Sequence, residues 1–293
     1  MDNAFEVAKL TKRFGATTAL DGITLAVPRQ RIVGLIGRNG CGKTTLLNHV
    51  VGLQLADRGV CTTLGQPAEE LGAEQLARIG MVWQDARFLD WMSVEQHIRY
   101  VAAFYERWDT AREKFLVDQL ELDRTASVGA LSPGNAQKLG IVLAVCHHPE
   151  LLLLDEPMSA LDPISREQVL AFLLELLQED GATTVISSHV LRDIESIVDW
   201  IVCLDRGRVL VDASLDELQD RYHEWQVTSL GPIAGAFPEP YVLSQRTNEH
   251  RAHLLVCDAS ELVEVFEGKY GVDVESRPLN LERIFPLLYG LGR

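Results

Sequence analysis

The segment GRNGCGKTT, residues 37–45, restricts the fold of this chain more than any other stretch. It follows RIVGLIG, a short apolar run with β-branched residues that is typical of a buried strand, and it precedes LLNHVVGL, which has helical character. Residues 37–44 fit the pattern G-x-x-x-x-G-K-[ST] in the strand–loop–helix order that the pattern requires. The sequence therefore predicts an α/β fold with a loop that cradles phosphate groups.

The chemistry of this loop follows from its residue types. Glycines let backbone N–H groups turn toward phosphate oxygens, and the dipole of the following helix favours an anion at its N-terminus. Lys43 can reach the β- and γ-phosphates, and the Thr44 hydroxyl can bind Mg²⁺. The residues expected to contact the nucleotide here are Gly37, Arg38, Asn39, Gly40, Cys41, Gly42, Lys43, Thr44 and Thr45.

Cys41 lies inside this loop, where a small side chain fits. A second hypothesis is that the positive field of the loop favours the thiolate, so that oxidation of Cys41 blocks nucleotide binding.

Two further segments that predict strands end in polar residues. ELLLLDEP (150–157) is typical of a strand buried on both faces, and ATTVISSHV (182–190) is a second β-rich segment. Ligands of open α/β sheets bind at the carboxyl ends of the strands. There Asp155 can hold Mg²⁺, Glu156 can polarise a water for attack on the γ-phosphate, and His189 is either structural or in contact with the terminal phosphate.

Composition narrows the class of protein. The chain has 293 residues and a net charge of −15, which disfavours non-specific binding to nucleic acid or direct adsorption to anionic lipid. Its five cysteines are scattered, which suits free thiols in a reducing compartment. The N-terminus has no apolar h-region, and no apolar run reaches the roughly 18 residues of a membrane span. We therefore expect a cytoplasmic chain that does not insert into the membrane directly.

The order of the motifs resembles the ATP-binding cassette (ABC) family over about residues 3–220. Phe14 in KRFGATTAL matches the aromatic residue that stacks on adenine, and Gln84 in MVWQD matches the glutamine that senses Mg²⁺ and the attacking water. LLLLDEP matches the Walker B strand, with Glu156 at the general-base position. SALD (159–162) matches the D-loop, and His189 matches the switch histidine. The resemblance implies a P-loop fold with a mainly parallel sheet, an antiparallel β part and a helical subdomain.

LSPGNAQK (131–138) resembles the signature motif of the family, which opens a helix facing the γ-phosphate held by the opposite subunit. Ser132 is a good N-cap residue, and Pro133 suits the first helical turn. Ser132 and Gly134 are thus expected to contact the partner's ATP. Pro133, Asn135 and Lys138 depart from the usual glycine, glutamine and arginine, so the chain pairs either with a second copy or with a different cassette that carries a standard signature.

The helical subdomain is expected at about residues 85–145. SVEQHIRYVAAFYERW (93–108) predicts a helix with Ser93 as its N-cap. By the resemblance, this subdomain docks on a membrane-spanning permease. The residues after the glutamine loop are read either as a docking patch or as ordinary core; they are Arg87, Phe88, Leu89, Trp91 and Met92.

The cassette is expected to span residues 1–222, and residues 223–293 are expected to form a small C-terminal α+β appendage. Three segments of the appendage predict strands, ASELVEVFEGKYG predicts a helix ending at Gly271, VDVESRP suits another strand, and NLERIFPLLYG predicts a last helix broken at Pro286. Similar appendages, ending in a stretch comparable to LERIF (281–285), occur on ATP-binding subunits of bacterial drug, antibiotic and lipid exporters. The appendage is either a regulatory or dimer-stabilising domain or a passive cap.

The resemblance implies an ATPase that uses ATP and Mg²⁺ to drive transport, and more specifically export, through a separate permease on the inner face of the cell membrane. One alternative is a soluble ABC ATPase acting on nucleic acid or ribosomes. Another is a catalytically silent regulatory binder, which the presence of Glu156 and His189 disfavours.

Overall fold

The computed structural model describes residues 3–84, 87–233 and 235–291. The chain divides into two compact units, Met1–Asp212 and Ala213–Arg293. The first unit contains a six-stranded sheet and a four-stranded sheet, and the second contains a further four-stranded sheet.

The six-stranded sheet positions the candidate site. Its strand order is β10–β9–β3–β8–β7–β6. Five neighbouring strands run parallel, namely β9 (Trp200–Asp205), β3 (Ile32–Gly37), β8 (Thr183–Ser188), β7 (Leu151–Asp155) and β6 (Ile79–Val82). β10 (Arg208–Ser214) forms the edge after a turn at Arg206 and Gly207. Every residue of β3, β7 and β8 is buried, as the apolar sequences of β3 and β7 predict. Because these strands pair in parallel, their carboxyl ends meet at one edge of the sheet.

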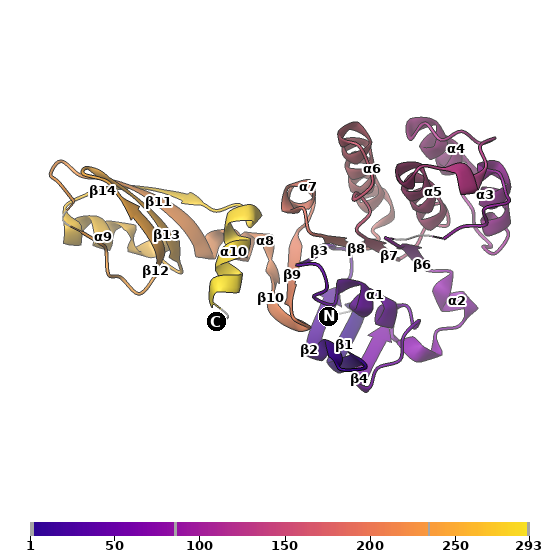
Figure 1. The fold of residues 1–293 in the computed structure, drawn as a ribbon, viewed down its shortest axis with the longest axis horizontal. Coiled ribbons are helices and arrows are strands. Elements are labelled where there is room, and N and C mark those ends of the chain that lie inside the picture. Colours follow the sequence, from indigo (N-terminus) through magenta and orange to yellow (C-terminus); the bar gives the residue numbers. More distant parts are fainter. Residues whose placement is uncertain (1–2, 85–86, 234, 292–293) are drawn as a thin grey trace. The chain divides into compact units, whose positions relative to one another are not determined.

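The two faces of this sheet are covered differently (Figure 1). Helices α5 (Pro133–Val145), α6 (Pro163–Asp180) and α7 (Leu191–Glu195) lie on one side. Helix α1 (Lys43–Val50) lies on the other side together with the antiparallel sheet. A shared apolar core joins that second layer to the central sheet, with Leu10, Leu20 and Leu47 packed together with Leu151 and Leu153. The site therefore lies on a sheet that is held from both faces.

The antiparallel sheet has the order β2–β1–β4–β5. It comprises β1 (Asn3–Phe14), β2 (Thr17–Pro28), β4 (Arg58–Thr63) and the short β5 (Gln66–Pro67). A short helix, α2 (Ala73–Leu76), leads from this sheet back to β6. The predicted mainly parallel sheet and antiparallel part are thus both present.

The helices between β6 and β7 begin where their cap residues predict. The Ser93 hydroxyl accepts a hydrogen bond from the N–H of Gln96 and opens α3 (Val94–Ala102). The prediction of one helix over 93–108 is wrong in extent, because α3 ends at Ala102 and α4 (Thr110–Gln119) starts separately. The Tyr105 ring stacks on the His147 ring with centroids 4.1 Å apart, a contact between distant parts of the chain that favours a turn over continued helix.

The second unit is an antiparallel sheet with helices. Its strand order is β12–β13–β11–β14, formed by β11 (Tyr222–Thr228), β12 (Val242–Thr247), β13 (Arg251–Cys257) and β14 (Asp273–Pro278). Helix α9 (Val263–Tyr270) ends at Gly271, whose φ of 64° is the left-handed conformation that glycine tolerates. The Trp225, Phe237 and Phe266 rings form the centre of its core.

Two features of this unit differ from the sequence prediction. Helix α10 (Leu281–Leu291) continues through Pro286 and is not broken there, because Leu281, Ile284 and Leu288 on both sides of the proline are buried and hold the helix in place. The unit also begins at Ala213 and not at residue 223, because α8 (Leu215–Arg221) contacts β11 and β14. Among the described residues, no helix is both long enough and apolar enough to cross a bilayer.

Candidate functional site

The phosphate-binding loop connects β3 to α1 at the carboxyl edge of the sheet. Gly42 precedes α1 with a φ of 113°, and a Cβ built there would lie 2.6 Å from the carbonyl oxygen of Ala19. A Cβ at Gly37 would meet the carbonyl oxygen of Leu204 at 2.6 Å. Packing within the chain therefore requires glycine at both ends of the loop.

Lys43 projects from the first turn of α1 into the interior of the site and is only 6% exposed. Its Nζ donates to the carbonyl oxygen of Gly37 at 2.9 Å and lies 3.2 Å from Oε1 of Glu156. Glu156 is equally buried. The loop and the acidic strand end are thus joined by a buried ion pair.

The Asp155 carboxylate, at the end of β7, is held by two hydroxyl groups. Thr44 Oγ1 donates to Oδ2 at 2.6 Å, and Ser187 Oγ donates to Oδ1 at 2.6 Å. Asp155 is fully buried, whereas Thr44 is exposed. The metal-ligand pair expected from the sequence, Thr44 and Asp155, is therefore in direct contact.

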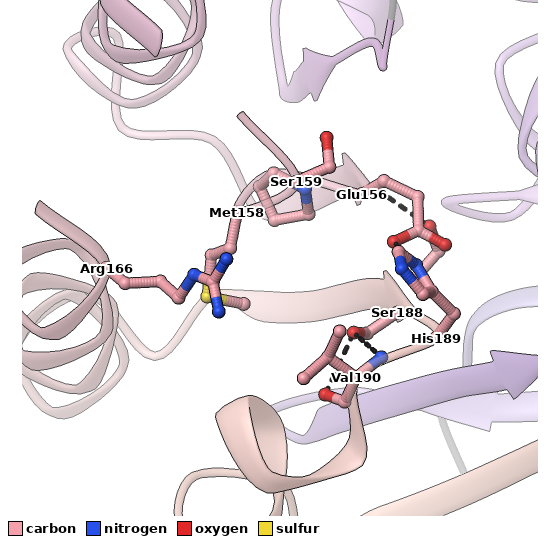
Figure 2. Close-up of a pocket in the computed structure, with 9 residues that line it drawn as sticks. Glu156, Met158, Ser159, Arg166, Ser188, His189 and Val190 are labelled. Atoms are coloured by element: carbon pink, nitrogen blue, oxygen red, sulfur yellow. Dashed lines mark hydrogen bonds and ion pairs between the residues drawn. The ribbon is translucent and has the colours of Figure 1, made fainter. Parts of the chain in front are cut away.

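Glu156 follows with a φ of 50°, the left-handed region that non-glycine residues adopt at a cost of roughly 1–2 kcal/mol. Its N–H donates to Ser187 Oγ at 2.9 Å, and its Oε2 lies 2.8 Å from Nδ1 of His189. Figure 2 shows the His189 ring turned toward this carboxylate. The turn aims the Glu156 side chain between Lys43 and His189, and strained backbone of this kind is concentrated at functional sites.

A cavity of about 350 Å³ lies over the loop. Its lining includes Ala19 and nine predicted site residues, namely Asn39, Gly40, Cys41, Gly42, Lys43, Thr44, Thr45, Gln84 and Glu156. Gln84 is exposed and lines the same cavity, just before the undescribed residues 85–86. A second, water-sized cavity of about 50 Å³ is lined by residues 156–159, Arg166 and residues 187–190, which include His189 (Figure 2).

Seven predicted site residues are not among those that line the larger cavity: His189, which lines the smaller one, Ser132 and Gly134 of the signature segment, and Gly37, Arg38, Asp155 and Phe14. Gly37 and Arg38 form the base of the loop, and Asp155 is buried beneath Thr44. Phe14 lies at the end of β1, is 49% exposed, and has Lys12 Nζ 5.6 Å from its ring centroid.

The signature segment forms the exposed N-terminus of α5. Ser132 is the N-cap, as predicted, and its hydroxyl accepts from the N–H of Asn135 at 3.2 Å. Pro133 occupies the first helical turn, where its missing N–H would have no intrahelical partner. A Cβ at Gly134 would lie 2.8 Å from the carbonyl oxygen of Ala160, so the D-loop of the same chain restricts that position to glycine. Ser132 and Gly134 are absent from the described lining of the larger cavity.

The Cys41 thiol does not behave as the redox hypothesis requires. Burial raises its pKa above the ordinary value, although Lys43 acts in the opposite direction. This direction is opposite to the one that a field-stabilised thiolate requires. Cys41 fills space, with its Sγ 2.4 Å from the position of a Cβ built on Gly37.

Sequence reasoning missed Ser187, which contacts both Asp155 and the backbone of Glu156. Its signal is the run of polar residues SSH that ends β8 next to the acidic strand.

The donor set fits a nucleoside triphosphate and a hard cation. A glycine-rich loop before a helix, with a buried lysine, suits phosphate oxygens. The Thr44 hydroxyl and Asp155 carboxylate are oxygen ligands of the kind that Mg²⁺ prefers. Across the described residues, no cluster of three or more histidine, cysteine or acidic side chains forms a separate metal site.

Comparison with known proteins agrees with this chemistry. The family model described as ABC transporter matches residues 20–159. The bacitracin transport ATP-binding protein BcrA of Enterococcus faecalis is 34% identical over 246 residues, which cover 82% of this chain and 79% of that protein. The chain belongs to the ABC transporter family. It is an ATP-binding domain of that family, and its enzymatic class is ATP hydrolase.

Other ABC relatives transport different substances. An aliphatic sulfonates import ATP-binding protein of Burkholderia lata is 35% identical over 72% of this chain, and a methionine import ATP-binding protein of Rhizobium johnstonii is 35% identical over 72%. The chain spans only 64% and 61% of the lengths of these two import proteins.

Solved structures agree on the ABC fold. The ATP-binding subunit of an ABC transporter superposes with a TM-score of 0.67 at 28% identity, covering 74% of this chain and 92% of that chain. A dimeric cassette in a post-hydrolysis state bound to ADP and phosphate superposes with a TM-score of 0.65 at 23% identity, covering 72% of this chain and 98% of that chain. The predicted fold class is confirmed.

Proposed function

We propose that this chain is the subunit that powers an ABC transporter by closing onto a second cassette around two Mg-ATP, in contact with a separate membrane-spanning permease. The observation that carries the proposal is the network at the strand ends. Lys43, Thr44, Asp155 and Glu156 contact one another beside the cavity over the phosphate-binding loop. Each contributes a group that phosphoryl transfer to water needs.

The proposed roles follow from position. Lys43 binds the β- and γ-phosphates, and Thr44 and Asp155, with Gln84, hold Mg²⁺, which neutralises charge on the transferred phosphoryl group. Glu156 takes the proton of the attacking water, and His189, 2.8 Å from Glu156, orients that carboxylate and contacts the γ-phosphate. Because Lys43 and Glu156 are ion-paired, phosphate binding to Lys43 competes with the pair and frees the Glu156 carboxylate to act on water.

The partner cassette supplies the other wall of each site. Ser132 and Gly134 lie at an exposed helix end away from the described lining of their own chain's cavity, which suits contact with ATP bound to another chain. In the first turn of α5, the Asn135 N–H already donates to the Ser132 hydroxyl, and Pro133 has no N–H. The Gly134 N–H is therefore the one left in that turn to donate to the phosphate. Phe14, exposed at the end of β1, is proposed to stack on adenine.

The partner is either a second copy or a different cassette. For a homodimer, ATP hydrolysis by the purified chain rises with the square of concentration when the protein is dilute. A chain that stays inactive alone at every concentration, and gains activity when a second cassette is added, establishes the heterodimer.

The permease is proposed to dock on aromatic residues of the helical part. Trp91, Phe104 and Tyr100 are 76%, 69% and 45% exposed, and the Tyr100 and Phe104 rings meet edge to face at 5.2 Å. Exposed apolar side chains grouped in this way mark protein contacts. Of the two interpretations of the segment after Gln84, the exposure of Trp91 favours docking over core. The chain would then act at the cytoplasmic face of the membrane, without inserting into the membrane itself and without a nucleic-acid partner.

Export is the proposed direction. The match to the bacitracin transport protein extends over 246 residues, whereas the matches to the sulfonate and methionine import proteins extend over 213 and 222. The longer match supports a shared domain organisation with the bacitracin transport protein, one that extends into the second unit of this chain. We assign the appended α+β domain an accessory role outside the ATP site.

The proposal is tested by Glu156→Gln. This variant keeps the shape of the side chain but cannot accept a proton, so it should bind Mg-ATP, hydrolyse it at least about 100-fold more slowly, and accumulate as a dimer. Light scattering coupled to size exclusion, with and without Mg-ATP, measures the dimer, and Lys43→Ala is the control that should bind ATP weakly. A Glu156→Gln protein that remains monomeric in saturating Mg-ATP, with its permease supplied, would refute the proposal.

A further inference from the structure

Ser187 lies one residue before the end of β8 and is fully buried. The parallel register between β7 and β8 places it opposite Asp155. Its hydroxyl donates to Asp155 Oδ1 at 2.6 Å and accepts from the backbone N–H of Glu156 at 2.9 Å. One oxygen atom therefore contacts both of the acidic residues on which the proposed reaction depends.

These two bonds fix different features of the site. Oδ2 of Asp155 accepts a hydrogen bond from Thr44, and Oδ1 accepts one from Ser187. Because both oxygens are held, the carboxylate cannot rotate about its Cβ–Cγ bond. The bond to the N–H of Glu156 holds a residue whose φ of 50° is strained. A hydroxyl can donate one hydrogen bond and accept others, so serine or threonine meets both demands at once.

The neighbouring serine does not duplicate this role. Ser188 Oγ bonds within its own loop, to the N–H and the carbonyl oxygen of Val190 (Figure 2). The contacts of Ser187 thus depend on its position in the strand and not on the local abundance of hydroxyl groups.

We propose that Ser187 is a positioning residue that couples the metal-binding carboxylate to the general base. It keeps Asp155 in the orientation that accepts Mg²⁺ and keeps the backbone of Glu156 in the turn that aims its carboxylate at the attacking water. Removal of the hydroxyl weakens Mg²⁺ binding and slows turnover together. This inference rests on the proposed ATPase function of the same site.

A residue with a merely structural role would lower stability and leave the metal dependence unchanged. Thr183, at the opposite end of β8, is the matched control because it is also buried and its hydroxyl also accepts from a backbone N–H, that of Gln30, at 2.9 Å. Thr183→Val removes that hydroxyl from the same strand at the end away from Asp155.

The experiment compares the full-length wild type, Ser187→Ala, Ser187→Thr and Thr183→Val. Steady-state ATPase assays at varied Mg²⁺ give kcat and the Mg²⁺ concentration for half-maximal rate. Calorimetric titration of Mg²⁺ into protein with a non-hydrolysable ATP analogue gives metal affinity independently of turnover. Thermal unfolding without nucleotide shows that each variant is folded.

Loss of a group that orients a metal ligand typically costs 10- to 100-fold in affinity or activity. We expect Ser187→Ala to weaken Mg²⁺ affinity and to lower kcat, each by about tenfold or more. Ser187→Thr, which keeps the hydroxyl, should recover most of both, and Thr183→Val should stay within about twofold of wild type in both. If Ser187→Ala does not fold, Ser187→Cys replaces it in the comparison. The loss of Mg²⁺ affinity and kcat should then be smaller than for alanine, because the thiol still donates a weak hydrogen bond.

A folded Ser187→Ala or Ser187→Cys protein with wild-type Mg²⁺ affinity and kcat overturns the inference. So does an equal change in Thr183→Val. A wild-type protein that shows no Mg²⁺-dependent hydrolysis with any partner overturns the proposed function instead, so the two failures are distinguishable.

Discussion

The buried pair between Lys43 and Glu156 predicts how strongly the two residues depend on one another for stability. The perturbation is Lys43→Met, alone and combined with Glu156→Gln. Lys43 Nζ lies 3.2 Å from Glu156, and each residue is 6% exposed. Methionine keeps much of the length of lysine but removes the charge, so Glu156 is left buried without its cationic partner, with His189 Nδ1 2.8 Å from its carboxylate.

Removal of one partner from a buried ion pair costs about 3–5 kcal/mol, because the other charge stays buried without compensation. Glu156 keeps His189 at 2.8 Å and borders a cavity, so we expect the lower end, about 3 kcal/mol, for Lys43→Met. Glu156→Gln leaves the lysine with the carbonyl oxygen of Gly37 and should cost about 2 kcal/mol. The double variant carries neither charge, so its cost should fall below the sum by about 2 kcal/mol.

Urea unfolding of the four proteins, in buffer free of nucleotide and divalent cations, measures this coupling. Bound ligand would stabilise the proteins unequally and must be absent. In a thermal unfolding experiment, the same cost of 3 kcal/mol corresponds to a fall of about 6–12 °C in the melting temperature of a unit of this size. A coupling energy near zero, with both single variants as stable as wild type, would show that the ion pair is not formed and would refute the reasoning.

Three further outcomes are expected. Gly134→Ala places a Cβ 2.8 Å from the carbonyl oxygen of Ala160, so ATPase activity should fall about tenfold while ATP binding to the monomer is retained, as nucleotide titration and turnover assays together would reveal. Burial lowers the pKa of His147 to about 4, so the unfolded state takes up a proton first as pH falls below 6.5. Stability should therefore drop by about 2 kcal/mol between pH 6.5 and pH 5, and His147→Phe should flatten that part of the urea-unfolding profile; an unchanged slope contradicts the assignment. Trp91→Ala removes an exposed ring and should change stability by less than about 0.5 kcal/mol while reducing co-purification of the permease; a large loss of stability would mean that Trp91 is core.

Local patterns determined much of the fold and of the site. The phosphate-binding loop was predictable because a strand, a glycine-rich turn and a helix follow one another within the segment that carries the chemistry. Ser93 and Ser132 open helices as predicted, because an N-cap bond joins residues only three positions apart. The buried strands β3 and β7 were predictable from continuous apolar runs.

Contacts between distant segments decided the features that local patterns predicted wrongly. The end of α3 and the passage of α10 through Pro286 depend on the burial of side chains by other elements, which outweighs local preference. The upward shift of the Cys41 pKa comes from burial of the loop, whereas its place in a positive loop suggested the reverse.

The sequence by itself determined which residues we propose for the chemistry, because motif spacing and strand ends identify Lys43, Thr44, Asp155 and Glu156. Only the tertiary structure decided how they are held. The register of β7 against β8 brings Ser187 to Asp155, and the packing of α1 against the sheet brings Lys43 to Glu156. Register and packing are properties of non-local pairing, to which a single sequence gives no direct signal.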